Sequence, residues 1–538
     1  MPAKLLTLLL SWLAVALLAL GLSLVRAADP TAFEAGLALL KDKDFEGKAE
    51  GIDKLVESAD PRARELLTAL LDGRLYVRGA DARLVYAEAE GRDWRIRDAL
   101  DGAELGKASR REVEKLTINN KLRGQLRGAI AVLSLAHSDP AARLAAVRDL
   151  QKQPDPALLP TLRQYRARER DPAIRAALDS LLALSGLASG QPAERLAAIA
   201  TLEGNTDPEV RTRLTALLSQ AEQDAAVVQA ARAALKRIDF KLQLYAFVET
   251  LFFGLSLGSV LVLAAIGLAI TFGVMGVINM AHGELMMLGA YTTYMVQQYV
   301  PVDWSLPLAV PAAFLVAALV GIAIERGVIR FLYDRPLETL LATFGISLIL
   351  QQTVRSIFSP LNRAVATPSW MSGAWEINGA LSLTLNRLWI VGFCLVVFTL
   401  LFLVLRRTTL GLQVRAVAQN RTMARAMGVR SSRVDALTFG LGSGIAGVAG
   451  VALSQLTNVG PNLGQSYIVD SFLVVVFGGV GNLWGTLVAG LSLGVANKVL
   501  EPWSGAVLAK ILVLAFIILF IQKRPRGLFP QKGRAAEA

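Results

Sequence analysis

A series of long apolar runs in the second half of the chain constrains the fold most. Eight runs follow residue 240, at 246–271, 285–300, 306–324, 337–354, 388–405, 434–456, 468–496 and 506–521. A helix needs about 20 apolar residues to cross the roughly 30 Å of hydrocarbon in a bilayer. Lipid offers the backbone no hydrogen-bond partners, and helices satisfy their own. Residues 241–530 are therefore predicted to form a bundle of transmembrane helices, followed by a cytoplasmic tail at 531–538.

Basic residues in the loops predict how this bundle is oriented. They form three clusters: Arg326, Arg330 and Arg335; Arg406, Arg407, Arg415, Arg421, Arg425, Arg430 and Arg433; Lys523, Arg524, Arg526, Lys532 and Arg534. Lysine and arginine favour cytoplasmic loops, so all three clusters are expected inside and the chain enters the bundle from outside. The net charge of +12 thus reflects membrane orientation, and no nucleic-acid binding is predicted.

The run 468–496 must then cross the membrane an even number of times. Its centre, Phe477 to Gly485, is too rich in glycine for a continuous helix. We expect a hairpin of two short helices. Broken backbone at membrane depth is tolerated where protein buries it or where it lines a cavity, which makes Asn482 a candidate for a solute path.

A second group of polar residues, Asn279, His282 and Glu284, lies just before the second apolar run. Polar side chains at membrane depth often line a transport path, so these three are further path candidates. They are equally typical of hydrogen bonds that hold helices together. Glu284 also suits the first turn of the following helix. One histidine and one carboxylate do not make a metal site, and no metal is predicted.

The first half of the chain is expected outside the membrane. Residues 1–27 resemble a secretory signal, with an uncleaved anchor as the alternative. Residues 28–240 would then be extracytoplasmic, in a multi-pass protein of the bacterial inner membrane. The single cysteine, Cys394, cannot form an intrachain disulfide, so this domain folds without one.

Aspartate followed by proline recurs along residues 138–238, at Asp139, Asp155, Asp171 and Asp207. Aspartate suits the N-cap and proline the first position of a helix. The spacing predicts helix pairs that resemble a short HEAT-like solenoid, a scaffold or docking surface. A few short strands are expected between Arg74 and Ile96. The predicted class is nevertheless all-α, a polytopic bundle with an N-terminal helical repeat domain.

The arginine-rich segment from Gly411 to Arg433 has helical spacing. It is predicted to be a short helix that docks on a cytoplasmic partner, the alternative being an orientation signal alone. The sequence contains no P-loop, so any ATP is expected on partner subunits and no cofactor on this chain. It shows no nucleophile and base pair, and no enzymatic activity is predicted.

Three motifs together resemble the permeases of branched-chain amino acid ABC importers over residues 245–530: GLAITFGVMGVINMAHGELMMLGAYTTY, RAVAQNRTMARAMGV and VVFGGVGNLWGTLVAGLSLGV. The resemblance implies a second related permease, two ATP-binding cassette subunits and an extracytoplasmic binding protein. It also implies a coupling loop that docks on the ATPase. Ala424 and Gly428 match its pattern, Thr422 and Met423 depart from it, and Arg415, Arg421 and Arg425 flank it.

The signal and the extracytoplasmic extension make the chain similar to the urea permeases within that family. Urea is small and neutral, with a carbonyl acceptor and N–H donors that amide and carboxylate groups can bind. Branched-chain amino acids or short amides are the alternative cargo. A membrane-anchored extracytoplasmic scaffold is a third hypothesis, and copurification with an ATPase would argue against it.

Overall fold

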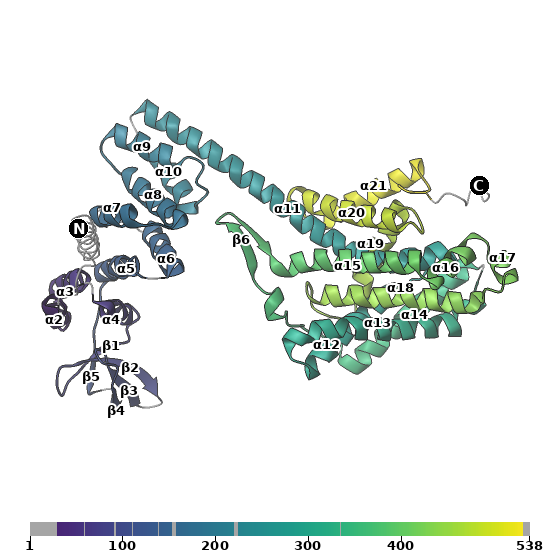
Figure 1. Ribbon diagram of the computed structural model, residues 1–538, viewed down its shortest axis with the longest axis horizontal. Coiled ribbons are helices and arrows are strands. Elements are labelled where there is room, and N and C mark those ends of the chain that lie inside the picture. Colours follow the sequence, from purple (N-terminus) through teal and green to yellow (C-terminus); the bar gives the residue numbers. More distant parts are fainter. Residues whose placement is uncertain are drawn as a thin grey trace, which may run out of the picture. The chain divides into compact units, whose positions relative to one another are not determined.

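The computed structural model describes residues 30–42, 44–58, 60–90, 93–109, 111–137, 139–152, 158–219, 224–333 and 335–530. The chain divides into two compact units, Met1–Lys241 and Leu242–Ala538 (Figure 1). The predicted signal at 1–27, the helix start at Asp155 and the tail at 531–538 lie outside the described residues.

The first unit opens with helices and a sheet. The helices are α2 (Pro30–Leu40), α3 (Phe45–Ser58), α4 (Pro61–Leu71) and α5 (Asn120–Ser134). The strands β1 (Leu75–Arg78), β2 (Leu84–Glu90), β3 (Asp93–Asp98), β4 (Glu104–Ala108) and β5 (Val113–Lys115) form an antiparallel sheet in the order β4-β3-β2-β1-β5. The all-α prediction is therefore wrong here, and the strands extend beyond Ile96. Each strand is short and buries only one to three apolar residues, such as Val85, Ala87 and Ile96. The alternation of apolar and polar residues that marks a strand is therefore weak in the sequence.

The rest of the first unit is helical and begins its helices where the sequence predicts. The helices are α6 (Pro140–Lys152), α7 (Leu159–Arg168), α8 (Pro172–Gly186), α9 (Pro192–Leu202), α10 (Pro208–Ser219) and the start of α11 (Ala225–Met275). Asp171 accepts hydrogen bonds from the backbone N–H groups of Ala173 and Ile174, which caps α8. Arg143 of α6 pairs with Glu169 at 2.9 Å. The aspartate-proline helix starts at Asp139, Asp171 and Asp207 are confirmed.

The second unit is a bundle of long helices. They are α11, α12 (His282–Tyr299), α13 (Val302–Gly327), α14 (Pro336–Phe358), α15 (Leu385–Arg407), α18 (Ser431–Ser454), α19 (Leu463–Gly478), α20 (Leu483–Ser504) and α21 (Ala506–Lys523). Within the described residues, seven of these helices have the length and hydropathy to cross a membrane; α12 and the shorter α19 are not among them. The predicted transmembrane bundle is thus confirmed in its main features.

Helix α18 forms the centre of the second unit, with 89% of its most apolar stretch buried. It packs on α12 and α13 through small residues, as membrane helices commonly do. A Cβ atom at Gly289 of α12 would overlap the backbone of Gly447 in α18. These two helices are therefore held at backbone contact, and a larger side chain there would separate them.

Two helices begin inside the bundle instead of at its surface. After α11 ends at Met275, residues 276–281 follow a non-helical path to His282, whose ring bonds back to the Ala264 carbonyl in the C-terminal part of α11. Helix α19 begins beside α12, where a Cβ atom on Gly283 would overlap the backbone of Gly464. Both α12 and α19 are thus interrupted spans, which meet at their first turns.

The run 468–496 is a hairpin, as predicted, with its turn at residues 479–482. Its arms are not both short, because α20 has 22 residues and can cross a membrane alone. Gly479 and Gly481 adopt φ values of +103° and +80°, which only glycine adopts easily, so the break falls at them and not across the whole glycine-rich stretch.

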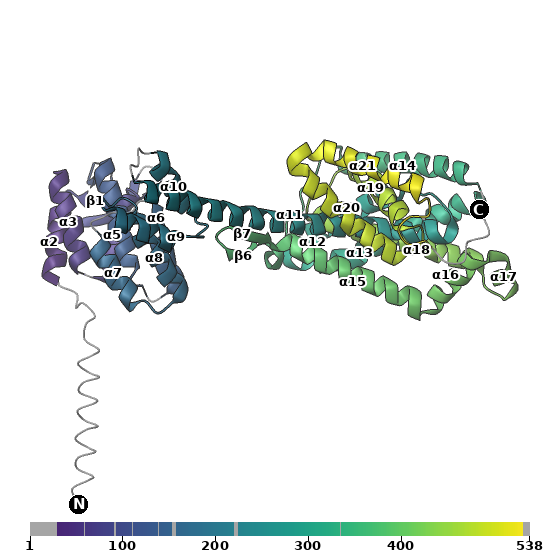
Figure 2. The same cartoon turned by 90° about the horizontal axis from the view of Figure 1, so that it is seen from above.

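The connections of the second unit carry smaller elements. Between α14 and α15 lie the 3-10 turn η3 (Ser369–Met371) and the antiparallel strands β6 (Ala374–Asn378) and β7 (Leu381–Thr384), a further departure from the all-α class. Between α13 and α14 lies η2 (Ile329–Phe331). Helices α16 (Thr409–Gln419) and α17 (Arg421–Ala426) follow α15 and continue beyond its end (Figure 2).

Candidate functional site

A buried carboxylate lies at the start of α12. Glu284 accepts hydrogen bonds through Oε1 from the Ser347 hydroxyl at 3.0 Å and from the Gln351 amide at 2.6 Å, both on α14. Its second oxygen, Oε2, has no partner within the described structure. Buried polar atoms are normally paired, so this oxygen marks a position where a further donor would be stabilised.

Two more of the sequence-predicted residues lie at the same place. Asn279 accepts a hydrogen bond from the backbone N–H of Ala281 at 3.0 Å, and His282 donates through Nε2 to the Ala264 carbonyl at 2.9 Å. The amide nitrogen of Asn279 and the Nδ1 atom of His282 have no partner among the described groups. With Glu284, all three side chains are at most 1% exposed. The three side chains are thus buried at the start of α12 but contact different elements, since His282 bonds to α11 and Glu284 to α14; we call them the polar cluster.

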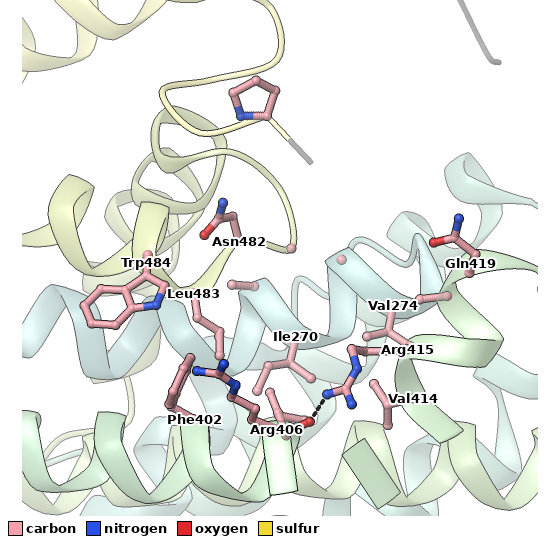
Figure 3. A pocket seen from close by; sticks show the side chains of 16 residues that line it. Ile270, Val274, Phe402, Arg406, Val414, Arg415, Gln419, Asn482, Leu483 and Trp484 are labelled. Atoms are coloured by element: carbon pink, nitrogen blue, oxygen red, sulfur yellow. Dashed lines mark hydrogen bonds between the residues drawn. The ribbon is translucent and has the colours of Figure 1, made fainter. Parts of the chain in front are cut away.

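Asn482 lies at a different place, in a cavity of about 790 Å³ (Figure 3). Its side chain caps α20 by accepting from the Gly485 N–H at 3.1 Å, and donates to the Phe529 carbonyl at 3.2 Å. The other lining residues come from α11, α15, α16, the turn before α20, α20 itself and the C-terminal segment: Ala269, Ile270, Gly273, Val274, Phe402, Leu405, Arg406, Val414, Arg415, Ala418, Gln419, Gly481, Leu483, Trp484 and Pro530.

The charged groups lining this cavity are Arg406 and Arg415. Figure 3 shows both guanidinium groups on the side opposite Asn482, with Arg415 hydrogen-bonded to the Leu405 carbonyl. The cavity therefore belongs to the end of the bundle that carries the basic loops, and not to the polar cluster of Asn279, His282 and Glu284.

The predicted coupling segment forms two helices instead of one. Asn420 separates them and caps α17 by accepting from the Met423 N–H at 2.9 Å, while Gly428, with φ of +85°, follows its end. Ala424 is buried, and Met423 and Met427 are 60% and 81% exposed. The surface that α17 presents outward thus includes two methionines, which adapt well to a partner surface.

The arginines predicted for this segment bind within the unit. Arg421 donates to Asp435 of α18 at 2.8 Å, and Arg425 donates to the Ser431 hydroxyl at 2.7 Å. The Asp435 side chain is 1% exposed, so its charge is compensated mainly by Arg421. These contacts tie α17 to the first turn of α18.

The sequence reasoning missed a second part of this junction. Glu325, near the end of α13, is buried and accepts a hydrogen bond from the Tyr333 hydroxyl at 2.8 Å. The Arg421 guanidinium lies over the Tyr333 ring, 4.7 Å from its centre. We call Glu325, Tyr333, Arg421 and Asp435 the α17 junction. Carboxylates at the ends of otherwise apolar runs were the available sequence signal.

The comparisons with known proteins agree with this architecture. The profile described as "Branched-chain amino acid transport system / permease component" matches residues 250–521. The LivH permease protein of the high-affinity branched-chain amino acid transport system of Salmonella typhimurium is 32% identical over 296 residues, covering 52% of this chain and 95% of that protein. BraD of Pseudomonas aeruginosa is 31% identical over 298 residues, covering 53% and 96%.

The ribose import permease protein RbsC of Escherichia coli is more distant, at 26% identity over 281 residues, covering 51% of this chain and 84% of that protein. No solved structure shows significant similarity to the chain. These relatives are transport permeases and not enzymes, and the matched residues are those of the helical bundle. The chain is a multi-pass membrane protein that belongs to the family of branched-chain amino acid transport permeases.

Proposed function

We propose that the chain is the permease subunit of an ABC importer that takes up urea by alternating access. A second related permease, two ATPase subunits and an extracytoplasmic binding protein complete the importer. Family membership supports a transport role, and the two helices α16 and α17 offer a surface for an ATPase. The observation that carries the proposal is the meeting of two interrupted helices, α12 and α19, inside the bundle.

Interrupted helices near the middle of a membrane are typical of solute sites in transporters, because their free backbone groups and helix ends can face a solute. The cluster of Asn279, His282 and Glu284 lies at one of these ends, and each side chain keeps one unpartnered polar atom. We propose that the cluster borders the solute path, and that Asn482 borders its cytoplasmic end in the cavity with Arg406 and Arg415.

Urea is the proposed cargo because of the extension that precedes the permease region. The family profile begins at residue 250, and the alignment with LivH covers 95% of that protein but only 52% of this chain. The extension thus sets this chain apart from the amino acid permeases that it resembles. Branched-chain amino acids are the second candidate, since LivH and BraD are named for their transport.

Uptake by the intact importer separates the two candidates. Deletion of the gene is expected to abolish ATP-dependent uptake of dilute labelled urea and to leave labelled leucine uptake unchanged. Loss of leucine uptake alone would assign the cargo to the second candidate. Normal uptake of both would contradict a role in either.

The first unit is proposed to lie outside the cytoplasm, delivered by the segment at 1–27, where its helices α6 to α10 form a HEAT-like docking surface. A reporter enzyme active only outside the cytoplasm, inserted after Leu202, is expected to be active. An inactive reporter would place this unit inside.

The scaffold hypothesis would require that no ATPase copurify with the chain.

A further inference from the structure

The outward face of α19 is polar in its first half. Asn462, Gln465 and Ser466 are exposed, and Asp470 is partly exposed on the same side of the helix. Their spacing of three and four residues places them on one face. The opposite face is buried and carries Ile468 and Val474. Helix α19 therefore presents amide, hydroxyl and carboxylate groups outward, together with the apolar Val469, which is 56% exposed.

Neighbouring helices add charges to this face. Lys510 of α21 donates to Asp470 at 3.3 Å, and Arg355 of α14 donates to the Asn462 side chain at 2.7 Å. We call Arg355, Asn462, Gln465, Ser466, Asp470 and Lys510 the α19 face. Lys510 lies within a helix that has the hydropathy of a membrane span, and its neighbour Ile511 is typical of the exposed apolar residues around it.

Lipid tails are unfavourable surroundings for the polar groups of the α19 face. Charged side chains within membrane spans are costly unless they meet water or protein, and they commonly mark solute or ion pathways. The Asp470 side chain remains 23% exposed and that of Lys510 58% exposed, so their pairing leaves both open to further polar contacts. Water or a polar partner is therefore the more favourable neighbour of this face.

The position of the α19 face in the bundle favours water over a polar partner as its neighbour. It begins next to Gly464, where a Cβ would overlap the backbone of Gly283 in the first turn of α12. The face thus adjoins the meeting point of the two interrupted helices. It lies at the opposite end of α19 from the turn that carries Asn482.

We infer that the α19 face is the water-lined surface of this chain along the solute path, at the mouth remote from the Asn482 cavity. Asp470 and Lys510 would present an anionic and a cationic group, and Asn462 and Gln465 amide groups, to a small polar or zwitterionic solute. The inference rests on the proposed transport function and adds to it which helix face the solute meets.

Thiol labelling of the assembled importer tests this placement. The chain has one cysteine, Cys394, which is buried, so the wild type serves as the background. Gln465→Cys and Ser466→Cys are expected to react with a membrane-impermeant trimethylammonium methanethiosulfonate about tenfold faster than Ile511→Cys, because lipid excludes a charged reagent. Ser372→Cys in the exposed outer loop is the control for full access.

Two outcomes would overturn the inference. If Gln465→Cys and Ser466→Cys react no faster than Ile511→Cys, the face meets lipid or dry protein. If they react only in the chain expressed without its partner permease, the face is a dry subunit contact. Uptake is measured on the same variants. If the cysteines label as expected but the importer carries neither urea nor leucine, only the proposed cargo is contradicted. If the importer transports urea but the cysteines do not label, only the assignment of the α19 face is contradicted.

Discussion

At the scale of single residues, the polar cluster at the start of α12 is the most consequential feature. Glu284 is the acceptor for two side chains of α14, so Glu284→Ala leaves Ser347 and Gln351 without it. An unpaired buried donor costs about 1–3 kcal/mol, which a large membrane bundle tolerates. We expect Glu284→Ala and Asn279→Ala to reduce uptake strongly while the amount of assembled complex in the membrane stays normal.

The control is Thr353→Ala. Thr353 is an exposed residue of α14, the helix that carries Ser347 and Gln351, and this variant is expected to transport like the wild type. If Glu284→Ala and Asn279→Ala instead lose the assembled complex, these residues serve packing, which was the alternative reading of the sequence.

In the first unit, the partly buried pair of Glu169 and Arg143 predicts a pH dependence. The side-chain hydrogen bonds from Arg143 hold the pKa of the Glu169 carboxyl below its usual value. A lowered pKa contributes stability that is complete above the unfolded value, about 4.3 for glutamate, and is lost as pH falls through the folded value. Hydrogen exchange in α6 and α8 of the purified protein is therefore expected to speed up below about pH 4.

Glu169→Gln is expected to exchange faster already at pH 7 and to respond less to acid. Asp149→Asn, which removes an exposed pair with Lys152, is the control and should match the wild type. An unchanged exchange rate in Glu169→Gln at pH 7 would show that the pair contributes nothing to stability.

At the scale of elements, α17 combines an outward surface with an inward anchor. Met423 and Met427 are exposed, and Ala424 is buried beneath them. If this surface docks on an ATPase, Met423→Glu with Met427→Glu should abolish copurification, because burying a carboxylate without a partner is costly. Ile377→Glu, at an exposed position of β6 outside α16 and α17, is the control and should copurify normally. Retained copurification of the double variant would exclude α17 as the docking helix.

The α17 junction predicts a different failure. Arg421→Ala leaves the buried Asp435 without its ion-pair partner, which costs about 3–5 kcal/mol when one member of a buried pair is removed. The outer surface of α17 is untouched, so the ATPase should still bind and hydrolyse ATP while uptake falls. The measurement is the ratio of solute transported to ATP hydrolysed in proteoliposomes.

The exchange of Arg421→Asp with Asp435→Arg should restore part of that ratio, and Arg430→Ala, an exposed neighbour, should leave it unchanged. An Arg421→Ala variant with a normal ratio would mean that the junction does not link α17 to α18.

At the scale of the whole molecule, the two units have separate hydrophobic cores. The buried clusters of the bundle contain only residues from Val260 onward, and the largest cluster of the first unit ends at Ala129. A chain that begins at Lys241 is therefore expected to insert and to copurify with its ATPase, because its basic loops still set the orientation. Membrane fractionation and copurification measure both. Failure to insert would show that the first unit is needed for delivery of the bundle.

The sequence by itself determined the composition of the spans, the three basic clusters and the helix starts after Asp139, Asp171 and Asp207, because these depend on hydropathy and local capping. It also located the polar residues at 279, 282 and 284. It did not reveal the extent of the sheet, because pairing between short strands is a non-local property.

Only the tertiary structure decided which polar residues lie together. At the start of α12, His282 bonds to α11 and Glu284 to α14, whereas Asn482 caps α20 in the cavity with Arg406 and Arg415. Arg421 binds Asp435 of α18 and lies over Tyr333, which in turn donates to Glu325 of α13. The physical reason is that hydropathy indicates whether a side chain is buried, but does not indicate which other side chain it contacts. That neighbour is set by how helices pack, here through glycines such as Gly289 and Gly447 that bring backbones into contact.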